Sequence, residues 1–276
     1  MNRLPIEKRV QIINLLVEGV SMRATSRIAD VSINTVTKLL IDVATACAEY
    51  QDKALRNLTC KRVEADEIWS FCYSKAKNVP AGKKGEFGVG DLWTWTALCA
   101  DSKLAVSWMV GARDYSTACD FMMDVSERLA NRVQLTTDGF RPYFSAVSNA
   151  FNNQVDYAQL VKIYGQPADS TDRRRYSPDE VSGTIIGKTI GKPVRDHIST
   201  SYVERQNLTM RMHMRRFTRL TNGFSKKAEN HLHAVSLYFM YYNFAKVHKT
   251  LRVTTAMEAG ISDHVWSIEE IVNLAQ

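Results

Sequence analysis

The sequence predicts an α/β protein that begins with a small all-helical part. Apolar residues recur at helical spacing near the N-terminus, whereas after about residue 62 the spacing changes to the period of strands. The chain has 276 residues, of which 45% are hydrophobic and 24% charged, so it can bury a sizeable core. We therefore expect one small helical domain followed by one larger α/β domain.

The first part has three short helices at helix-turn-helix spacing. The first helix carries apolar residues at helical intervals: Ile6, Val10, Ile13 and Val17. Gly19 ends this helix, and a second helix begins after Ser21. A third helix begins after Ser32 and extends to about Val43, because serine is a favoured N-cap residue.

Polar residues of the third helix point away from its apolar side. They are Asn34, Thr35, Thr37 and Lys38. A recognition helix presents such side chains to the base edges and phosphates of duplex DNA. Residues 1–48 are therefore predicted to form a DNA-binding domain, and the alternative is a three-helix bundle used for dimerisation or structure. Residues 49–62, with mixed charge and few large apolar side chains, are predicted to be a connector.

The larger domain, residues 63–245, opens with three strands and continues with alternating helices and strands. The expected strands and helices are Arg62–Phe71, Leu92–Ala100, Leu104–Val110, a helix around Ala118–Leu129, Arg132–Thr137, a helix of about Arg141–Phe151, and a further strand. Asp101-Ser102-Lys103 joins two of the strands as a hairpin, and Arg128 is expected on the outer surface of its helix. This is the order of the ribonuclease H-like (retroviral-integrase-like) fold, with an insertion near residues 152–198.

Three carboxylates fall where such a fold places metal ligands. Asp66 lies in the first strand, Asp138 follows the fourth, and Glu204 begins a long basic helix. Neighbouring carboxylates repel one another unless a cation compensates them, and two Mg²⁺ ions (or Mn²⁺) clamping a phosphoryl group would do so. Magnesium prefers oxygen ligands. The five cysteines contain no C-x-x-C pair, so we expect no zinc and reduced thiols.

Each acid also has a structural alternative. Glu67 competes with Asp66, because side chains alternate across a strand and only one of the two can face the site. Asp138-Gly139 is a common turn dipeptide. Glu204 follows Ser201 by three residues, which is the spacing of a capping box, so its carboxylate could serve only the helix start.

The helix that begins near Glu204 is rich in basic and polar residues. We expect its DNA contacts to come from Arg205, Asn207, Arg211, His213, Arg215 and Arg216. Arg211 and Arg215 share a helical face with Glu204 and would lay a cationic track suited to a phosphate backbone. The alternative is a solvated basic helix face.

Three sequence blocks carry a family resemblance. They are Asp66–Phe71, Thr137–Tyr143, and Val203–Leu208 followed by Arg211–Arg216 and Phe224-Ser225-Lys226. At these residues the chain resembles the DDE transposases related to the first-described bacterial insertion sequence. The resemblance implies a metal-dependent enzyme that cuts at terminal inverted repeats and joins 3′-hydroxyls to target DNA. Relatives often carry a cysteine-rich zinc module ahead of the helix-turn-helix, which this sequence lacks, and the stretch Asn152–His197 is longer than expected.

Three further segments have weaker signals. The Lys75–Gly90 loop is basic and glycine-rich, and it is either a DNA contact or a surface loop. Arg173-Arg174-Arg175 could contact DNA, although a solvated charge run is the simpler interpretation. Trp69, Trp93, Trp95 and Trp108 alternate on strands and are expected in the core. Residues 246–276 form a tail with a helix from about Ser267, which either closes the domain or joins protomers.

Charge and hydropathy indicate the partners. A net charge of +7 and a pI near 9.1 favour a polyanion, here double-stranded DNA bound by a homodimer or higher homo-oligomer. The most apolar stretch, Leu92–Val110, is interrupted by Asp101 and Lys103, so no membrane span is expected. Without a secretory signal, the expected location is a bacterial-type cytoplasm, at the nucleoid. The alternatives are a related nuclease or integrase, and a non-catalytic DNA-binding regulator derived from a transposase.

Overall fold

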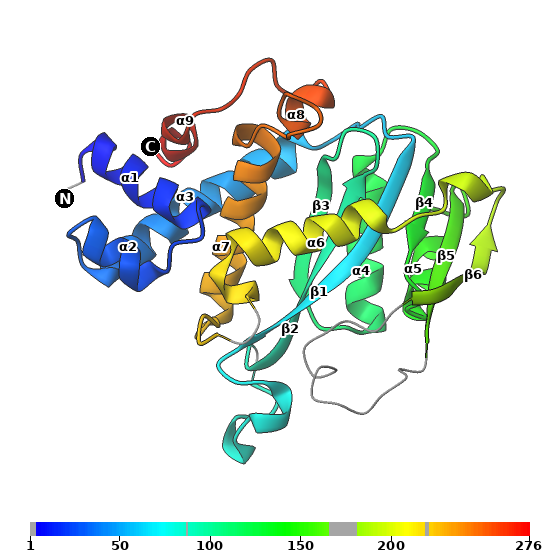
Figure 1. Ribbon diagram of the computed structural model, residues 1–276, viewed down its shortest axis with the longest axis horizontal. Helices are drawn as coiled ribbons and strands as arrows, with labels where there is room; N and C mark the ends of the chain where they lie inside the picture. The colour runs from blue at the N-terminus through cyan, green and yellow to red at the C-terminus, as the bar shows by residue number, and fades with distance from the viewer. Residues whose placement is uncertain (1–3, 87, 166–180, 219–220) are drawn as a thin grey trace.

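The computed structural model describes residues 4–86, 88–165, 181–218 and 221–276. Three helices, α1 (Ile6–Val17), α2 (Met22–Ile28) and α3 (Ile33–Ala54), lie beside a larger part built on a six-stranded sheet (Figure 1). The chain is therefore a mixed α/β protein with a helical N-terminal part, as predicted.

Local sequence signals set the end of α1 and the starts of α2 and α3 as expected. The hydroxyls of Ser21 and Ser32 accept hydrogen bonds from the backbone N–H groups of Ala24 (3.2 Å) and Thr35 (3.1 Å), which caps α2 and α3. Gly19 follows α1 with φ +80°, where a side chain would be strained. A Cβ at Gly19 would also lie 2.8 Å from the carbonyl oxygen of His213, so this glycine permits close packing on a distant segment.

Helix α3 is longer than predicted and contains the first part of the expected connector, residues 49–54. Its apolar stripe continues past Val43 through buried Ala44 and Cys47. The second half of α3 packs against α7 (Ala228–Met240). Ser236 donates to the carbonyl oxygen of Ala44 at 2.7 Å, and Gln51 donates to that of Ser236 at 3.2 Å. Tertiary packing therefore extends the helix beyond the point where large apolar residues become sparse.

The sheet has the strand order β3-β2-β1-β4-β5-β6. Its strands are β1 (Arg62–Cys72), β2 (Gly90–Cys99), β3 (Ala105–Gly111), β4 (Gln134–Thr137), β5 (Asp156–Tyr164) and β6 (Val181–Ile190). The first three strands form an antiparallel meander, whereas β4 is parallel to both β1 and β5. The predicted hairpin is confirmed. The antiparallel edge strand β6 lies within the insertion and was not expected.

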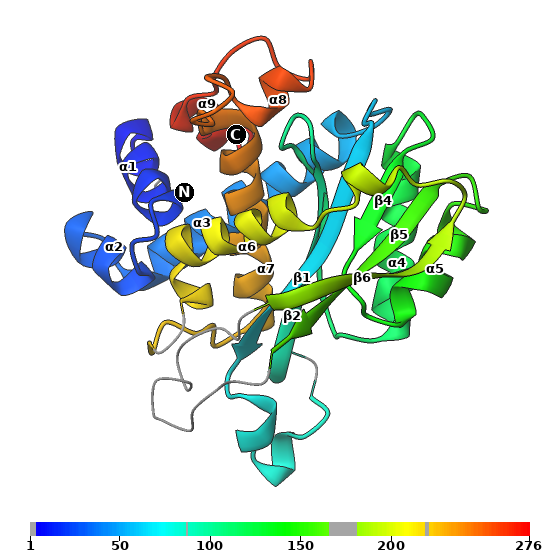
Figure 2. The same cartoon turned by 45° about the vertical axis from the view of Figure 1, so that its right-hand side comes forward.

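Helices cover both faces of the sheet (Figure 2). On one face, α4 (Tyr115–Arg128) and α5 (Pro142–Ala150) pack over Ala65 and Trp95, which are fully buried. On the other face, α6 (Ser201–His213) and α7 pack over Ile68. Because side chains alternate along β1, neighbouring residues of this central strand reach different helical layers.

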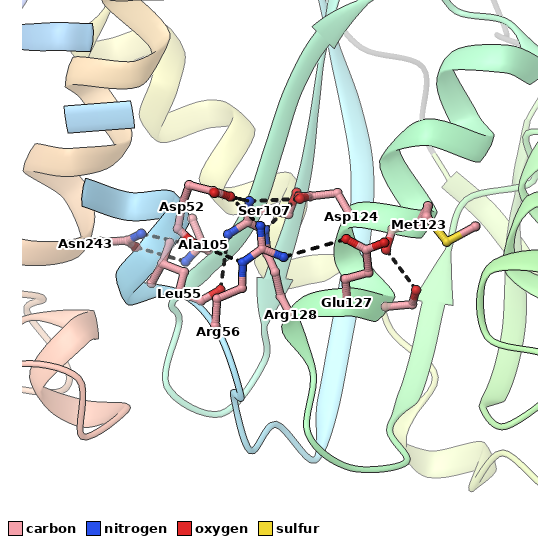
Figure 3. A network of polar contacts seen from close by, with 11 residues as sticks. Asp52, Leu55, Arg56, Ala105, Ser107, Met123, Asp124, Glu127, Arg128 and Asn243 are labelled. Carbon is pink, nitrogen blue, oxygen red and sulfur yellow. Dashed lines mark hydrogen bonds and ion pairs between the residues drawn. The ribbon is translucent and has the colours of Figure 1, made fainter. Parts of the chain in front are cut away.

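The expectation that Arg128 lies on the outer surface is wrong. Its side chain is only 11% exposed and joins α4 to the end of α3 (Figure 3). The guanidinium donates to Asp124 at 2.7 Å, to Asp52 at 2.9 Å and to the carbonyl oxygen of Leu55 at 3.1 Å. Because α3 continues to Ala54, its residue Asp52 lies beside Arg128 and covers a face of α4 that we expected to be exposed to solvent.

The C-terminal tail packs onto the N-terminal helices. After α7, a π-helical turn (Tyr241–Ala245) leads to α8 (Thr255–Glu258) and α9 (Ile268–Asn273), and α9 lies against α1. Ser267 and Glu270 form a capping box at the predicted start of α9. Within the described ranges, no single helix is long and apolar enough to cross a membrane; α2 and α3 pass that test only as a pair bent by 112°.

Candidate active site

Three acidic side chains converge at the centre of the sheet. Asp66 and Glu67 come from the middle of β1, and Asp138 follows β4, which is paired in parallel with β1. One carboxylate oxygen from each of the three lies within 4.8 Å of the others. The parallel pairing explains this convergence, because the carboxyl end of β4 stops beside the middle of the longer β1.

The carboxylate of Glu67 is already occupied by protein donors. One oxygen accepts from the Nε of Arg113 and the other accepts from the hydroxyl of Tyr143 at 2.7 Å. The Glu67 side chain is 1% exposed and lies on the α4 and α5 side of the sheet. Of the two neighbouring acids, Asp66 is therefore the one with an oxygen left for an external ligand.

Asp66 faces α6 and is electrostatically strained. Burial raises the pKa of its carboxyl to about 8, and the nearby charges of Glu67 and Asp138 add to this effect. The amide nitrogen of Asn207 donates to Asp66 at 2.8 Å, whereas the amide oxygen of Asn207 is buried without a hydrogen-bond partner among the described residues. Asn207, which we expected to contact DNA, thus belongs to the carboxylate site.

Asp138 serves both the turn and the site. One of its oxygens accepts from the backbone N–H of Phe140 at 2.9 Å, which is the turn predicted as the alternative. The other oxygen lies 3.4 Å from the guanidinium of Arg113. Burial raises the pKa of Asp138 as well. The turn therefore orients the carboxylate toward Asp66 instead of removing it from the site.

Glu64 fixes the start of α6, so the capping-box interpretation of Glu204 is wrong. Glu64 lies two residues before Asp66 on β1 and accepts from the backbone N–H groups of Tyr202 (2.8 Å) and Val203 (3.0 Å). No side chain of α6 itself caps its N-terminus. A buried carboxylate from the sheet does so instead, which ties the position of Glu204 to the strand that carries Asp66.

Glu204 lies close to the other acids but outside their oxygen cluster. One of its oxygens accepts from the hydroxyl of Thr200 at 2.7 Å and is paired with the ammonium group of Lys162 on β5. The charge of Glu204 nevertheless contributes to the raised pKa values of Asp66 and Asp138. The third acid is thus at the site, with its carboxylate bonded to a lysine.

The predicted basic track along α6 is only partly present. The helix ends at His213, and Met214 has extended backbone angles, so Arg215 lies in the following turn and not on the helical face of Glu204. His213 contacts Lys246 at 2.6 Å. Arg216 donates to Ser225 and to the carbonyl oxygen of Asn230, and burial lowers its pKa to about 10. Of the other predicted positions, Arg205 is exposed and Arg211 is half-buried.

The four polar residues predicted on the third helix differ in accessibility. Asn34 and Lys38 are exposed, as a recognition helix requires. Thr35 and Thr37 are half-buried, and both hydroxyls are engaged locally, with Ser32 at 2.9 Å and with the carbonyl oxygen of Ile33 at 2.9 Å.

A basic cleft lies between the N-terminal helices and the segment that joins α6 to α7. Its volume is about 730 Å³, and Thr37 lies in its wall. Its exposed cationic lining residues are Arg23, Arg215 and Lys226, while Arg216 is engaged with Ser225 and Asn230. Apolar side chains make up much of the remaining wall, and the described lining contains no aspartate or glutamate. Such a cleft is suited to a polyanion.

The remaining predicted segments have different outcomes. The Lys75–Gly90 loop contains two short 3₁₀ turns, and its lysines 75 and 83 lie over the rings of Trp69 and Tyr73. Trp95 is fully buried as expected, whereas Trp69, Trp93 and Trp108 are half-buried. Residues 173–175 lie outside the described ranges.

Three site residues were missed in the sequence: Glu64, Arg113 and Lys162. Arg113 lies over the ring of Phe140 at 4.1 Å and bridges Glu67 and Asp138. A charged side chain within the otherwise uncharged stretch Tyr157–Tyr164 is a usable signal for Lys162, whereas Glu64 is one of several charged residues of β1 and does not stand out. Arg113 follows a strand in a short polar loop, where nothing in the sequence distinguishes it from a surface cation.

The donor set fits a hard divalent cation. Asp66 and Asp138 offer carboxylate oxygens within one cluster, and Asn207 adds an unpartnered amide oxygen beside Asp66. Glu204 lies outside this cluster, with its carboxylate on Lys162. Magnesium and manganese take such ligands, whereas structural zinc sites use cysteine and histidine. Among the residues that the structure places, the only group of three or more His, Cys, Asp or Glu side chains with this geometry is the one at Asp66.

Comparisons with protein-family models and with curated protein sequences give no match. Among solved structures, the chain is similar to a Mos1 strand transfer complex and to a Mos1 transposase paired-end complex with the left transposon end. Each is 12% identical over 57% of this chain, with a TM-score of 0.25. A piggyBac transposase synaptic complex with hairpin DNA is 10% identical over 79% of this chain, with a TM-score of 0.31. The matches span 59%, 60% and 52% of those three chains, and at such TM-scores they assign neither fold nor function here.

Proposed function

We propose that this protein is a DDE transposase that cuts and joins DNA at the terminal inverted repeats of an insertion sequence. The observation that carries the proposal is the convergence of Asp66 and Asp138 beneath helix α6, whose first turn carries Glu204. The order of the first five strands, with β1 central and parallel to β4, supports a ribonuclease H-like catalytic domain. The three sequence blocks of the family resemblance fall on these same elements.

Asp66, Asp138 and Glu204 would hold two Mg²⁺ ions, which Mn²⁺ can replace. Bound divalent ions supply charge neutralisation and activation of oxygen nucleophiles in phosphoryl transfer. Asn207 orients the Asp66 carboxylate, and Arg113 holds Glu67 and Asp138. Glu64 fixes the start of α6 relative to β1, which keeps the helical turn that carries Glu204 next to the strand of Asp66.

Double-stranded DNA is the proposed substrate, bound through two surfaces. Residues 1–48 would act as a helix-turn-helix domain, with Asn34 and Lys38 at the major groove. The basic cleft would hold phosphates of the same DNA between this domain and the carboxylates. Both ends of an element must be brought together, so we expect a homodimer or a higher homo-oligomer acting at a bacterial-type nucleoid.

The test is metal-dependent cleavage of a duplex that carries an element end. Asp66→Asn, Asp138→Asn and Glu204→Gln should each abolish cleavage with Mg²⁺ or Mn²⁺ while DNA binding persists, because the amides keep the size of the side chain and lose the charge of the ligand. Asp120→Asn, on the exposed face of α4, is the matched control and should cut normally. Full cleavage by any of the three variants would remove that residue from the site.

A non-catalytic DNA-binding regulator remains the competing function. It predicts tight binding to the element end with no strand cleavage by the parent protein under any metal. A related nuclease would cut but would not join the 3′-hydroxyl to a target duplex, so a strand-transfer assay separates it from a transposase.

A further inference from the structure

Lys162 forms an ion pair with Glu204. It lies on β5, in the stretch Tyr157–Tyr164, where it is the single charged side chain. Its ammonium group contacts the Glu204 oxygen that also accepts from Thr200. Strand β5 pairs in parallel with β4, and Asp138 directly follows β4. Lys162 therefore lies on the strand next to the one that positions Asp138.

Two protein cations thus compensate the acids of the site. Arg113 serves Glu67 and Asp138 from one side, and Lys162 serves Glu204 from the other. The two pairs differ in burial. Glu67 is 1% exposed and is held on both oxygens, whereas the side chains of Lys162 and Glu204 are 26% and 40% exposed. Exposed ion pairs contribute little to stability, so the second pair can open at small cost.

We propose that Lys162 is a positioning residue that stands in for a divalent ion at Glu204. Its ammonium occupies the Glu204 carboxylate in the metal-free site, and Glu204 leaves the lysine when it becomes a metal ligand. The inference rests on the proposed function, since it assumes that Glu204 binds metal. It accounts for the one acid of the three whose carboxylate lies outside the cluster around Asp66.

If Lys162 and a divalent ion compete for Glu204, replacing the lysine should increase the affinity for the metal. Removing a positive charge from Lys162 should tighten metal binding, because the ion then has no competitor for Glu204. The gain should be on the order of fivefold, which corresponds to the upper range for a solvent-exposed ion pair. A lysine that merely stabilised the fold, or that held Glu204 in its metal-binding position, would give unchanged or weaker binding when replaced.

The experiment is calorimetric titration of the full chain with Mn²⁺, comparing the parent with Lys162→Met. Methionine keeps the length of the aliphatic stem, and thermal unfolding of each variant verifies that it is folded. The matched control is Lys188→Met on the adjacent strand β6, which makes the same change in net charge, while its ammonium lies over the Phe144 ring of α5, on the opposite face of the sheet. Glu204→Gln should weaken binding.

Tighter Mn²⁺ binding in Lys162→Met alone supports the inference. Unchanged or weaker binding, or an equal gain in Lys188→Met, would overturn it while leaving the metal site intact. If the parent itself bound no divalent ion, the proposed function would fail together with the inference. A second readout is NMR of ¹³C-labelled lysine side chains: Mg²⁺ should shift the Lys162 signal and leave that of Lys188 in place, and an unmoved Lys162 signal at saturating Mg²⁺ contradicts the exchange.

Discussion

Replacing Asp66 by asparagine should stabilise the metal-free protein at neutral and alkaline pH. The pKa of this carboxyl is about 8 in the folded protein against an ordinary value of 3.8, so the folded state holds the proton more tightly than the unfolded state. The contribution of the Asp66 proton to the free energy of unfolding is present in full below pH 3.8, and it is lost as the pH rises through about 8. Asparagine keeps the hydrogen bond from Asn207 and never ionises.

The size of the effect follows from the same pKa values. Neutral pH lies about three pH units above the ordinary pKa, and each unit is about 1.4 kcal/mol, which sets a ceiling of about 4 kcal/mol at pH 7. Because Asp66 is partly solvated, we expect about 1–2 kcal/mol. This corresponds to about 2–4 °C in Tm for each kcal/mol in a chain of this size.

The assay is thermal unfolding in EDTA at pH 5, 7 and 8.5. Asp66→Asn should match the parent most closely at pH 5, where Asp66 is protonated, and exceed it increasingly at higher pH. Asp120→Asn, at an exposed position, should show no such trend. A difference between Asp66→Asn and the parent that stays constant across the three pH values would refute the reasoning, because the carboxyl would then not titrate in this range.

Three further predictions concern stability and DNA. Arg128→Met should lower the free energy of unfolding by about 2 kcal/mol, measured by urea unfolding, because it removes the hydrogen bonds to Asp124, Asp52 and the carbonyl oxygen of Leu55; a loss below about 0.5 kcal/mol, the level of a surface substitution, would contradict this. Asn34→Ala combined with Lys38→Ala should weaken binding to element ends in a competition assay by about 1–3 kcal/mol for each base that either side chain reads, and an unchanged preference over random DNA would argue against α3 as the recognition helix. Arg215→Ala combined with Lys226→Ala should flatten the log–log salt dependence of duplex binding by about two units, whereas a parental slope would exclude phosphates from the cleft.

Much of the fold could be predicted from local signals. Caps at Ser21, Ser32 and Ser267 mark helix starts, and alternating apolar residues mark the strands around Asp66. The end of α3 could not be predicted, because the second half of that helix is stabilised by packing against α7, almost two hundred residues away. Propensity over a short window carries no information about such a partner.

In the candidate site, too, local features could be predicted and contacts between distant segments could not. Asp66 and Asp138 could be placed because each lies in or directly after a strand, where periodicity is informative. The partners of the acids could not be predicted, since Lys162 reaches Glu204 from β5 and Arg113 reaches Glu67 and Asp138 from the loop after β3. The predicted cationic stripe on α6 failed for a local reason: Met214 turns the backbone away from the helix, and no glycine or proline signals that break.

The length of α3 sets the distance between its DNA-reading end and the end that is anchored to the rest of the protein. Its 22 residues span about 33 Å at 1.5 Å per residue, and one end carries Asn34 while the other is fastened to α7 and, through Asp52, to Arg128. If Asn34 reads DNA, the reading surface and the carboxylates are fixed to one rod, with no hinge in the helix itself. The protein would then cut at a constant number of base pairs from the sequence that it reads, so element ends with altered spacing between the two should be poor substrates even when both sequences are intact.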